Sequence, residues 1–458
     1  MTICTRFLGL NHPLNVISDI KNAENLPFSE ILPIDELLQH IPETNSRERV
    51  FTTEVVLWAF LSQVMDDDQS QQAAVARVIA ASLAQKIRPP SSNTSAYSQA
   101  RSRLSEDLIS RLTREIAKKT ASNTPSQWLW KGKHVKLVDG STISMPDTPE
   151  NQKAYPQPSS QKEGLGFPIA RILAIIDYQT GMVLDFETAQ YTGKNTGEHA
   201  LLRQLMDSFN QDDIMIGDAY YPSFFLMASL IKRGISGVFP ARGSRKYDFR
   251  KGKRLGKKDH IAKWVKPRRP TWMTQEEYDD YPKDILIREV CVKNQKNGFR
   301  TKGRILVTTL LDATEVSPVD LQMLYDCRWC VELTLRSIKS TMHMDILRGK
   351  TPSMVKKEMW IHLLAYNLIR RIMAHAAWLY KRTTTSLSFK LALQVIKSFE
   401  QAGLFNEDNP LLYQKLFKAI VSKKIGNRPG RQEPRAIKRR PKIVPKLQTP
   451  RGLNKNVA

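Results

Sequence analysis

The sequence contains few cysteines and no long uninterrupted hydrophobic run. Its four cysteines (Cys4, Cys291, Cys327 and Cys330) are too few and too scattered over 458 residues for a disulfide framework. No apolar run reaches the roughly 18–20 residues that cross a membrane, and the N-terminus lacks the apolar core and cleavage site of a signal peptide. We therefore expect a cytoplasmic protein without a membrane segment.

Several familiar motifs are also missing from the sequence. It contains no Walker loop, GxGxxG, HExxH or internal repeat. Cys327 and Cys330 form a CxxC, but no second CxxC or nearby histidine pair completes a zinc site. The surrounding LYDCRWCVEL has a helical pattern, so helix packing is favoured there over a metal or redox role.

Acidic residues are scarce relative to basic ones. Seventy Lys and Arg against 45 Asp and Glu give a net charge of +25, while the hydrophobic fraction of 41% is ample for buried cores. Such an excess costs self-repulsion and is normally offset by a polyanion. Because no amphipathic anchor or lipidation signal is evident, nucleic acid is favoured over an anionic membrane surface.

The first 120 or so residues show a helical pattern. Residues 50–65 and 71–87 have the apolar periodicity of helices, and a Ser/Pro-rich break separates them from a third helix that starts near Ser95. A DNA-contacting module fits this pattern, with a solvated basic helix face as the alternative. The third helix carries four arginines: Arg101, Arg103, Arg111 and Arg114.

From about residue 123 the pattern changes to alternating strands and helices, which predicts an α/β domain with a mixed sheet. A basic, β-rich insertion then interrupts it: residues 243–270 hold 12 Lys and Arg but only two acids. Helices return at 317–342 and 355–382. The tail from 423 to 458 holds 12 Lys and Arg, one acid and five prolines, and we expect disorder there. The expected strands of the domain are HVKLVDG, 170–178, 182–190, 213–222 and 237–242, with helices at 197–209 and 223–235.

Three carboxylates in this region suit metal-dependent phosphodiester chemistry, which a pair of divalent ions held by carboxylates can perform. Asp139 and Asp218 are each expected at the end of a strand. Glu332 lies on the helix after the insertion, in the pattern Tyr325-x2-Arg328-x3-Glu332-x6-Lys339. Steps of 3, 4 and 7 residues put these side chains on one helical face. Turn or cap aspartates and an i,i+4 ion pair on a solvated face are the alternatives.

This signature, together with VDGS and IGDAYY, resembles the DDE transposases of the fourth insertion-sequence family over about residues 90–385. EGLGFPIARILAIIDYQTG and KKEMWIHLLAYNLIRRIM are softer matches. The resemblance implies a ribonuclease H-like catalytic core, with the insertion between its fifth strand and the glutamate-bearing helix. It also implies that Asp139, Asp218 and Glu332 bind two Mg²⁺ (or Mn²⁺) ions. Tyr325, Arg328 and Lys339 would then hold phosphates of the transposon end.

The implied activity is bacterial cut-and-paste transposition. The protein would cut double-stranded DNA at inverted-repeat ends and transfer the 3′-OH to target DNA, as a homodimer on DNA, in the nucleoid-associated cytoplasm. Two alternatives stay open: a nuclease of the same fold, and a catalytically silent DNA-binding protein derived from a transposase. Loss of a carboxylate would mark the second, and all three are present.

Each further candidate for DNA contact has two interpretations. The best-studied relatives stack a flipped base on a tryptophan of the insertion, and here Trp264 and Trp272 are available. The basic surroundings of Trp264 make it a candidate for this stacking, with core packing as the alternative. The remaining candidates for DNA contact are Arg242, Asn367, Arg370 and Arg371.

These inferences divide the chain into five segments. The two parts of the catalytic core flank the insertion. The segments are a helical DNA-end-binding domain (1–122), the first part of the core (123–242), the basic β-rich insertion (243–316), the second part of the core (317–385), and a C-terminal helical segment with the basic tail (386–458).

Overall fold

The computed structural model describes residues 50–84, 86, 88–159, 162, 164–243, 245–293, 303–401 and 410–423. The tail from residue 424 onward, expected to be disordered, lies outside these residues. The chain forms two compact units, each built from separate stretches of the sequence. One unit combines Met1–Gly132, Ile176–Asp185 and Leu333–Ile425, and the other combines Lys133–Ile175, Phe186–Glu332 and Gly426–Ala458.

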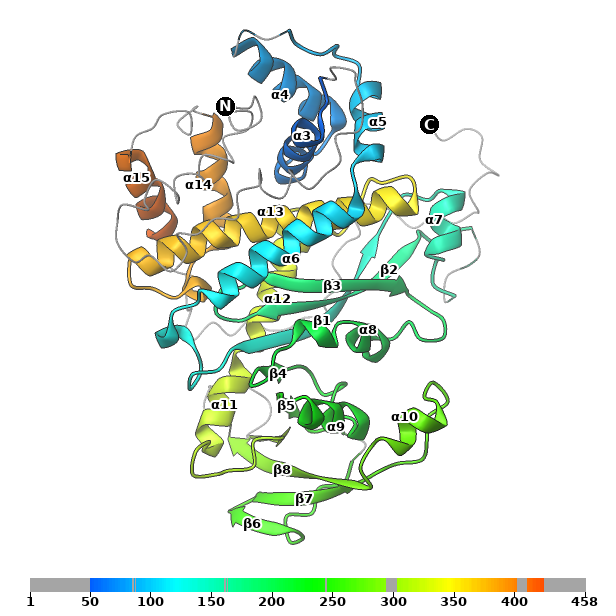
Figure 1. Ribbon diagram of the computed structural model, residues 1–458, viewed down its shortest axis with the longest axis vertical. Helices are drawn as coiled ribbons and strands as arrows, with labels where there is room; N and C mark the ends of the chain where they lie inside the picture. The colour runs from blue at the N-terminus through cyan, green and yellow to red at the C-terminus, as the bar shows by residue number, and fades with distance from the viewer. Residues whose placement is uncertain are drawn as a thin grey trace. The chain divides into compact units, whose positions relative to one another are not determined.

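The first unit is helical and is built around α13 (Pro352–Leu379). Thr351 caps this helix and Pro352 occupies its first turn, a favourable start for a helix. Nearly every residue from Val355 to Ala377 is buried, because other helices surround α13. Among them α6 (Glu106–Ser122) runs alongside it (Figure 1). The other helices are α3 (Thr53–Met65), α4 (Gln71–Ala84), α5 (Ser95–Arg103), α14 (Phe389–Gln401) and α15 (Pro410–Val421).

The third predicted helix is in fact two, α5 and α6. Ser105 lies between them and accepts a hydrogen bond from the Leu108 amide, which caps α6. Glu106 and Asp107 follow in the first turn, where acidic residues stabilise a helix. This capping signal lies inside the predicted helix and overrides its apolar periodicity.

Two of the four arginines expected to face DNA are engaged by other side chains of the protein. Arg101 is 4% exposed and stacks on Phe60 at 3.9 Å. Arg114 pairs with Asp185 at 2.8 Å and lies over the ring of Trp360. Arg103 and Arg111 are exposed, so the basic surface of these helices is smaller than expected.

The second unit contains most of a mixed sheet. Within the described residues nine strands follow the order β3-β2-β1-β4-β5-β9-β8-β7-β6. The β1–β4 and β4–β5 pairs are parallel, as an α/β crossover requires, with α8 (Glu198–Gln204) and α9 (Phe224–Lys232) in the connections. The predicted α/β pattern is thus confirmed. The first five strands are β1 (Val135–Ser144), β2 (Ile169–Asp177), β3 (Val183–Gln190), β4 (Ile214–Ile216) and β5 (Ser236–Pro240).

The insertion is β-rich, as predicted, but it continues the main sheet. Its last strand pairs antiparallel with β5, with Val238 opposite Thr308. Buried Arg288 holds the insertion together by pairing with Asp259 at 2.6 Å and donating to the Val316 carbonyl at 2.7 Å. The elements of the insertion are β6 (Lys253–Gly256), β7 (Asp259–Val265), α10 (Gln275–Asp279), β8 (Asp284–Lys293) and β9 (Gly303–Thr308).

After the insertion the chain enters α11 (Pro318–Asp326) and then α12 (Trp329–Arg336). Ser317 caps α11 and forms a reciprocal capping box with Asp320, which confirms the predicted start. A short helix α7 (Pro149–Ala154) follows β1. No helix in the described ranges is long and apolar enough to cross a membrane.

Candidate active site

Asp139 and Asp218 come from neighbouring parallel strands. β1 and β4 pair with Leu137 opposite Ile216, and each aspartate lies two residues beyond these partners. Since the two strands are parallel, both aspartates lie at the same edge of the sheet, and the charge of Asp218 acts on Asp139. The register therefore directs the two carboxylates to neighbouring positions.

The predicted strand ends were wrong in detail. β1 runs on to Ser144, so Asp139 lies inside a strand, whereas β4 stops at Ile216, before Asp218. Local hydrogen bonds fix both carboxylates: Asp139 Oδ1 accepts from the Gly140 amide at 2.9 Å, and Asp218 Oδ1 accepts from the Tyr220 amide at 2.8 Å.

A fourth carboxylate lies beside this pair. Glu198, the first residue of α8, accepts a hydrogen bond from the Tyr221 hydroxyl at 2.8 Å, and its Oε1 lies directly against Gly140. The sequence analysis did not single it out. Its only local signal is an acid in the first turn of a helix, which is too common to indicate a site.

The helix expected to carry Glu332 is broken. α11 ends at Asp326, α12 begins at Trp329, and the five residues that follow it, Ser337–Thr341, are π-helical. The prediction that Tyr325, Arg328, Glu332 and Lys339 share one face of a single helix is therefore wrong. A π-turn holds an extra residue and rotates the side chains that follow it, and such turns are frequent at functional sites.

Arg328 connects Glu332 with the aspartates. Its Nη2 donates to Glu332 Oε1 at 2.5 Å, the i,i+4 ion pair that the sequence left open. The same guanidinium acts on Asp139, whose pKa it lowers. Nearby Tyr325 is buried, with the Arg304 guanidinium 4.9 Å from the centre of its ring.

The electrostatics of Asp139 tie these groups into one site. Burial, and to a smaller extent the carboxylates of Glu198 and Asp218, raise the pKa of Asp139 to about 6 against the Gly140 hydrogen bond and the charge of Arg328. Because burial is the main cause, the ionised carboxylate is poorly solvated, and a bound cation would stabilise it.

The donor chemistry fits a hard divalent cation, because Mg²⁺ and Mn²⁺ prefer carboxylate oxygen. In the part of the chain that the structure describes, no three His, Cys, Asp or Glu side chains gather closely enough to hold an ion. The Arg328–Glu332 ion pair supplies a reason: Glu332 is engaged by a guanidinium. Its use as a ligand requires release from Arg328.

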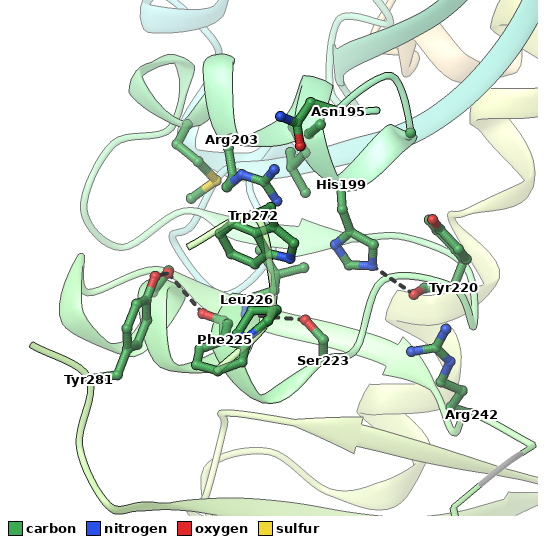
Figure 2. A pocket seen from close by; sticks show the side chains of 16 residues that line it. Asn195, His199, Arg203, Tyr220, Ser223, Phe225, Leu226, Arg242, Trp272 and Tyr281 are labelled. Atoms are coloured by element: carbon green, nitrogen blue, oxygen red, sulfur yellow. Dashed lines mark hydrogen bonds between the residues drawn. The ribbon is translucent and has the colours of Figure 1, made fainter. Parts of the chain in front are cut away.

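A cavity of about 380 Å³ opens next to this site (Figure 2). Tyr220, two residues after Asp218, lines it, and His199 Nε2 bonds the Tyr220 carbonyl at 3.0 Å. Trp272, from the insertion, is 40% exposed and carries the Arg203 guanidinium over its ring at 3.9 Å. The lining thus combines aromatic rings with cationic side chains.

A sequence model described as the transposase DDE domain matches residues 130–368, just over half of the chain. The chain belongs to this family. A second model, described as the insertion element 4 transposase N-terminal region, matches residues 23–114. The resemblance inferred from the sequence is confirmed, and the protein is a transposase enzyme.

Relatives agree with this assignment. The transposase InsG for insertion sequence element IS4 of Escherichia coli is 24% identical over 96% of both chains. The putative transposase InsL for element IS186A of the same species is 35% identical over 16% of this chain and 20% of its own length. A solved piggyBac transposase synaptic complex with hairpin DNA is 13% identical, with a TM-score of 0.43 over 95% of this chain and 87% of that chain.

Several residues of this transposase that were candidates for DNA contact are buried. Trp264 is 2% exposed; its indole N–H donates to Glu289 at 2.8 Å, and Arg245 covers its ring at 3.8 Å. It therefore packs the insertion, and the stacking interpretation is corrected.

On α13, Arg371 is 2% exposed and cannot reach DNA from its present position. Arg370 is also buried, and its Nε donates to the Tyr366 hydroxyl at 2.6 Å. The Asn367 side chain accepts a hydrogen bond from the Val183 amide at 2.9 Å and donates one to the Val183 carbonyl at 2.8 Å. It thus pairs with the Val183 backbone as a neighbouring strand would. Because α13 packs among other helices and against β3, all three side chains are buried and none is available to DNA in this structure.

Arg242 and Lys339 remain candidates for DNA contact. Arg242 is exposed and lines the cavity, with its guanidinium 5.8 Å from the centre of the Tyr220 ring. Lys339 lies in the π-helical segment of the first unit, where burial lowers its pKa. A partly buried lysine in such a segment is suited to an anionic partner.

Proposed function

We propose that this transposase cuts DNA at the inverted-repeat ends of its element and transfers the 3′-OH to target DNA. In this proposal Asp139, Asp218 and Glu332 hold two divalent cations, Mg²⁺ or Mn²⁺. The observation that carries it is the parallel register of β1 and β4, which directs two carboxylates to neighbouring positions.

The core of the second unit is, in this proposal, ribonuclease H-like. Two features support it: the fourth strand lies beside the first and parallel to it, and the insertion falls between the fifth strand and the glutamate-bearing helix. The position of the insertion was expected from the resemblance, and the pairing of the fourth strand with the first brings Asp139 and Asp218 from distant parts of the sequence to one edge of the sheet.

Two divalent ions would supply an activated oxygen nucleophile and stabilise the leaving oxygen of the phosphodiester. Asp139 and Asp218, fixed by their hydrogen bonds, hold their carboxylates in place before substrate arrives. Arg328 exchanges Glu332 for a DNA phosphate, an anion that a guanidinium binds equally well. DNA binding thereby releases the third carboxylate.

In this proposal the DNA backbone next to the carboxylates is bound by Tyr325, Arg328, Lys339 and Arg242. The cavity beside Asp218 accommodates a flipped base of a hairpinned end, with Trp272 as the stacking ring, because Trp272 is exposed and Trp264 is buried. Because two ends are cut and paired, the protein acts as a homodimer on DNA, with sequence reading by the N-terminal helices.

The test uses the full chain, a labelled cognate end duplex and a target plasmid in Mg²⁺. We expect cut ends and joined product from the unchanged protein, and neither from Asp139→Asn at equal end binding. Cut ends without joined product would indicate a nuclease. End binding without either product would indicate a silent DNA-binding protein.

A further inference from the structure

Glu198 and Tyr221 form a pair that lies against the two glycines adjoining Asp139 and Asp218. The Tyr221 hydroxyl donates to Glu198 Oε2 at 2.8 Å, and the tyrosine is fully buried. This pair joins α8 to the loop that follows β4, the loop that carries Asp218.

Two glycines make room for the pair. Gly140 follows Asp139, and a Cβ atom there would collide with the Glu198 carboxylate. Gly217 precedes Asp218, and a Cβ atom there would lie 2.6 Å from the Tyr221 ring. Each aspartate is thus flanked by a glycine against which one member of the pair rests, so the pair and the aspartates are held in a fixed arrangement.

In the described part of the chain no lysine or arginine forms an ion pair with Glu198, and the hydrogen bond to its carboxylate comes from the neutral hydroxyl of Tyr221. Its carboxylate lies against Gly140, the residue directly after Asp139, so the Glu198 and Asp139 carboxylates are held close together. A second carboxylate close to a partly buried one is unfavourable unless a cation is bound there.

We propose that Glu198, oriented by Tyr221, is a positioning residue of the cation site, adding negative charge beside Asp139 and fixing the backbone at Gly140. This inference rests on the proposed function. A purely structural role, an acid that stabilises the start of α8, is the competing explanation, and it predicts no effect on cation affinity.

The experiment measures Mn²⁺ affinity by electron paramagnetic resonance of the free ion, with the full chain bound to a pre-cut end duplex. Outer partners of metal ligands typically contribute about 10- to 100-fold in affinity. We expect a loss of that size for Glu198→Gln, which keeps the shape of the side chain. Tyr221→Phe keeps the charge and should give a smaller loss in the same direction.

Glu187→Gln, at a partly buried carboxylate of β3, is the matched control and should bind Mn²⁺ like the unchanged protein. Asp139→Asn reports on the proposed function itself. If Asp139→Asn loses Mn²⁺ affinity while Glu198→Gln and Tyr221→Phe keep it, Glu198 is only a helix-start acid. If Asp139→Asn also keeps full affinity, the assignment of the cation site fails, and this inference with it.

Discussion

Asp139 is a residue at which stability and function oppose each other. Its pKa is raised to about 6, above its usual value, so at pH 7 the ionised carboxylate costs folding free energy in the absence of a cation. We predict that Asp139→Asn stabilises the cation-free protein at pH 7 by about 1–3 kcal/mol, discounted for partial exposure, while it abolishes cleavage.

Urea unfolding at pH 7 with a chelator present measures this difference. The control is Asp213→Asn, which removes one partner of the buried Lys136–Asp213 ion pair and should destabilise the protein. A cation-free Asp139→Asn protein less stable than the unchanged one would show that Asp139 is an ordinary structural carboxylate.

The two tryptophans of the insertion give a second prediction. Trp272→Ala should weaken binding of a hairpinned end by about 1–3 kcal/mol, the usual contribution of one base–aromatic stack. It should also remove the fluorescence change of 2-aminopurine placed at the hairpin tip. Trp264→Phe is the control and should retain both signals, since Trp264 is buried. The reverse pattern would place the base on Trp264.

His375 gives the protein a pH-dependent stability. It is fully buried beside Phe417, and burial, then Arg371, lowers its pKa to about 4. Between about pH 6.5 and 4, His375 is protonated in the unfolded chain but stays neutral in the folded one. The contribution of neutral His375 to folding stability is therefore complete above pH 6.5 and is lost as the pH falls.

We predict that His375→Phe reduces the fall in unfolding free energy between pH 7 and pH 4.5 by up to roughly 3 kcal/mol. Some slope should remain, because the pKa of His362 is also lowered to about 4. Urea unfolding at several pH values is the measurement. Parallel pH curves for the two proteins would mean that His375 does not titrate in this way.

At the scale of the helices and strands, the proposed mechanism makes the α11–α12 segment the link between DNA binding and the carboxylates. Arg328→Ala removes one proposed phosphate contact, so the slope of log affinity against log salt for the transposon end should fall by about one. Arg233→Ala is the control, because Arg233 is a surface arginine paired with Asp207. It lies just before the start of β5, at the opposite end of the parallel strands from Asp218. Equal slopes for both variants would leave Arg328 as an ion-pair partner only.

Local patterns were enough to predict most of the strands and helices. The β1–β5 succession, the β-rich insertion and the capped start at Ser317 all follow from hydrophobic periodicity and capping residues within a few positions. Asp139 and Asp218 could be proposed because each closes an apolar strand pattern. Glu332 required the longer signature and the family resemblance.

The remaining features depend on contacts between distant parts of the sequence. Nothing local distinguishes Glu198 from any acid at a helix start; its partner Tyr221 is 23 residues away. The inward turn of Arg101 depends on Phe60, and the burial of Arg371 depends on helices packed around α13. The π-turn around Lys339 leaves no pattern in the sequence, so a regular helix was the natural expectation.

At the scale of the whole chain, the N-terminal helices share a core with the C-terminal ones. Lys357 Nζ of α13 donates to the Ser102 carbonyl at 2.7 Å, and Asn367 bonds the Thr113 carbonyl at 3.3 Å. A fragment starting near Ser122 would remove α6 and expose the apolar face of α13. End recognition is therefore better tested by substitutions at exposed positions such as Arg103 in the full chain.

The net charge of +25 belongs to the same scale. Part of it is neutralised inside the protein, as at Arg288 and Arg114, which are paired with Asp259 and Asp185. The exposed remainder supplies sequence-independent attraction to DNA, which brings the chain to any duplex but does not select an end. In the proposed mechanism, catalysis then depends on the three carboxylates.

That central claim is tested most directly by exchanging a carboxylate for a thiolate and changing the metal. Asp139→Cys and Asp218→Cys in the full chain should bind the end duplex normally and cut nothing in Mg²⁺, because Mg²⁺ avoids sulfur ligands. In Mn²⁺, which tolerates sulfur better, cleavage should return in part. Cleavage by either variant in Mg²⁺ at the rate of the unchanged protein would contradict the account.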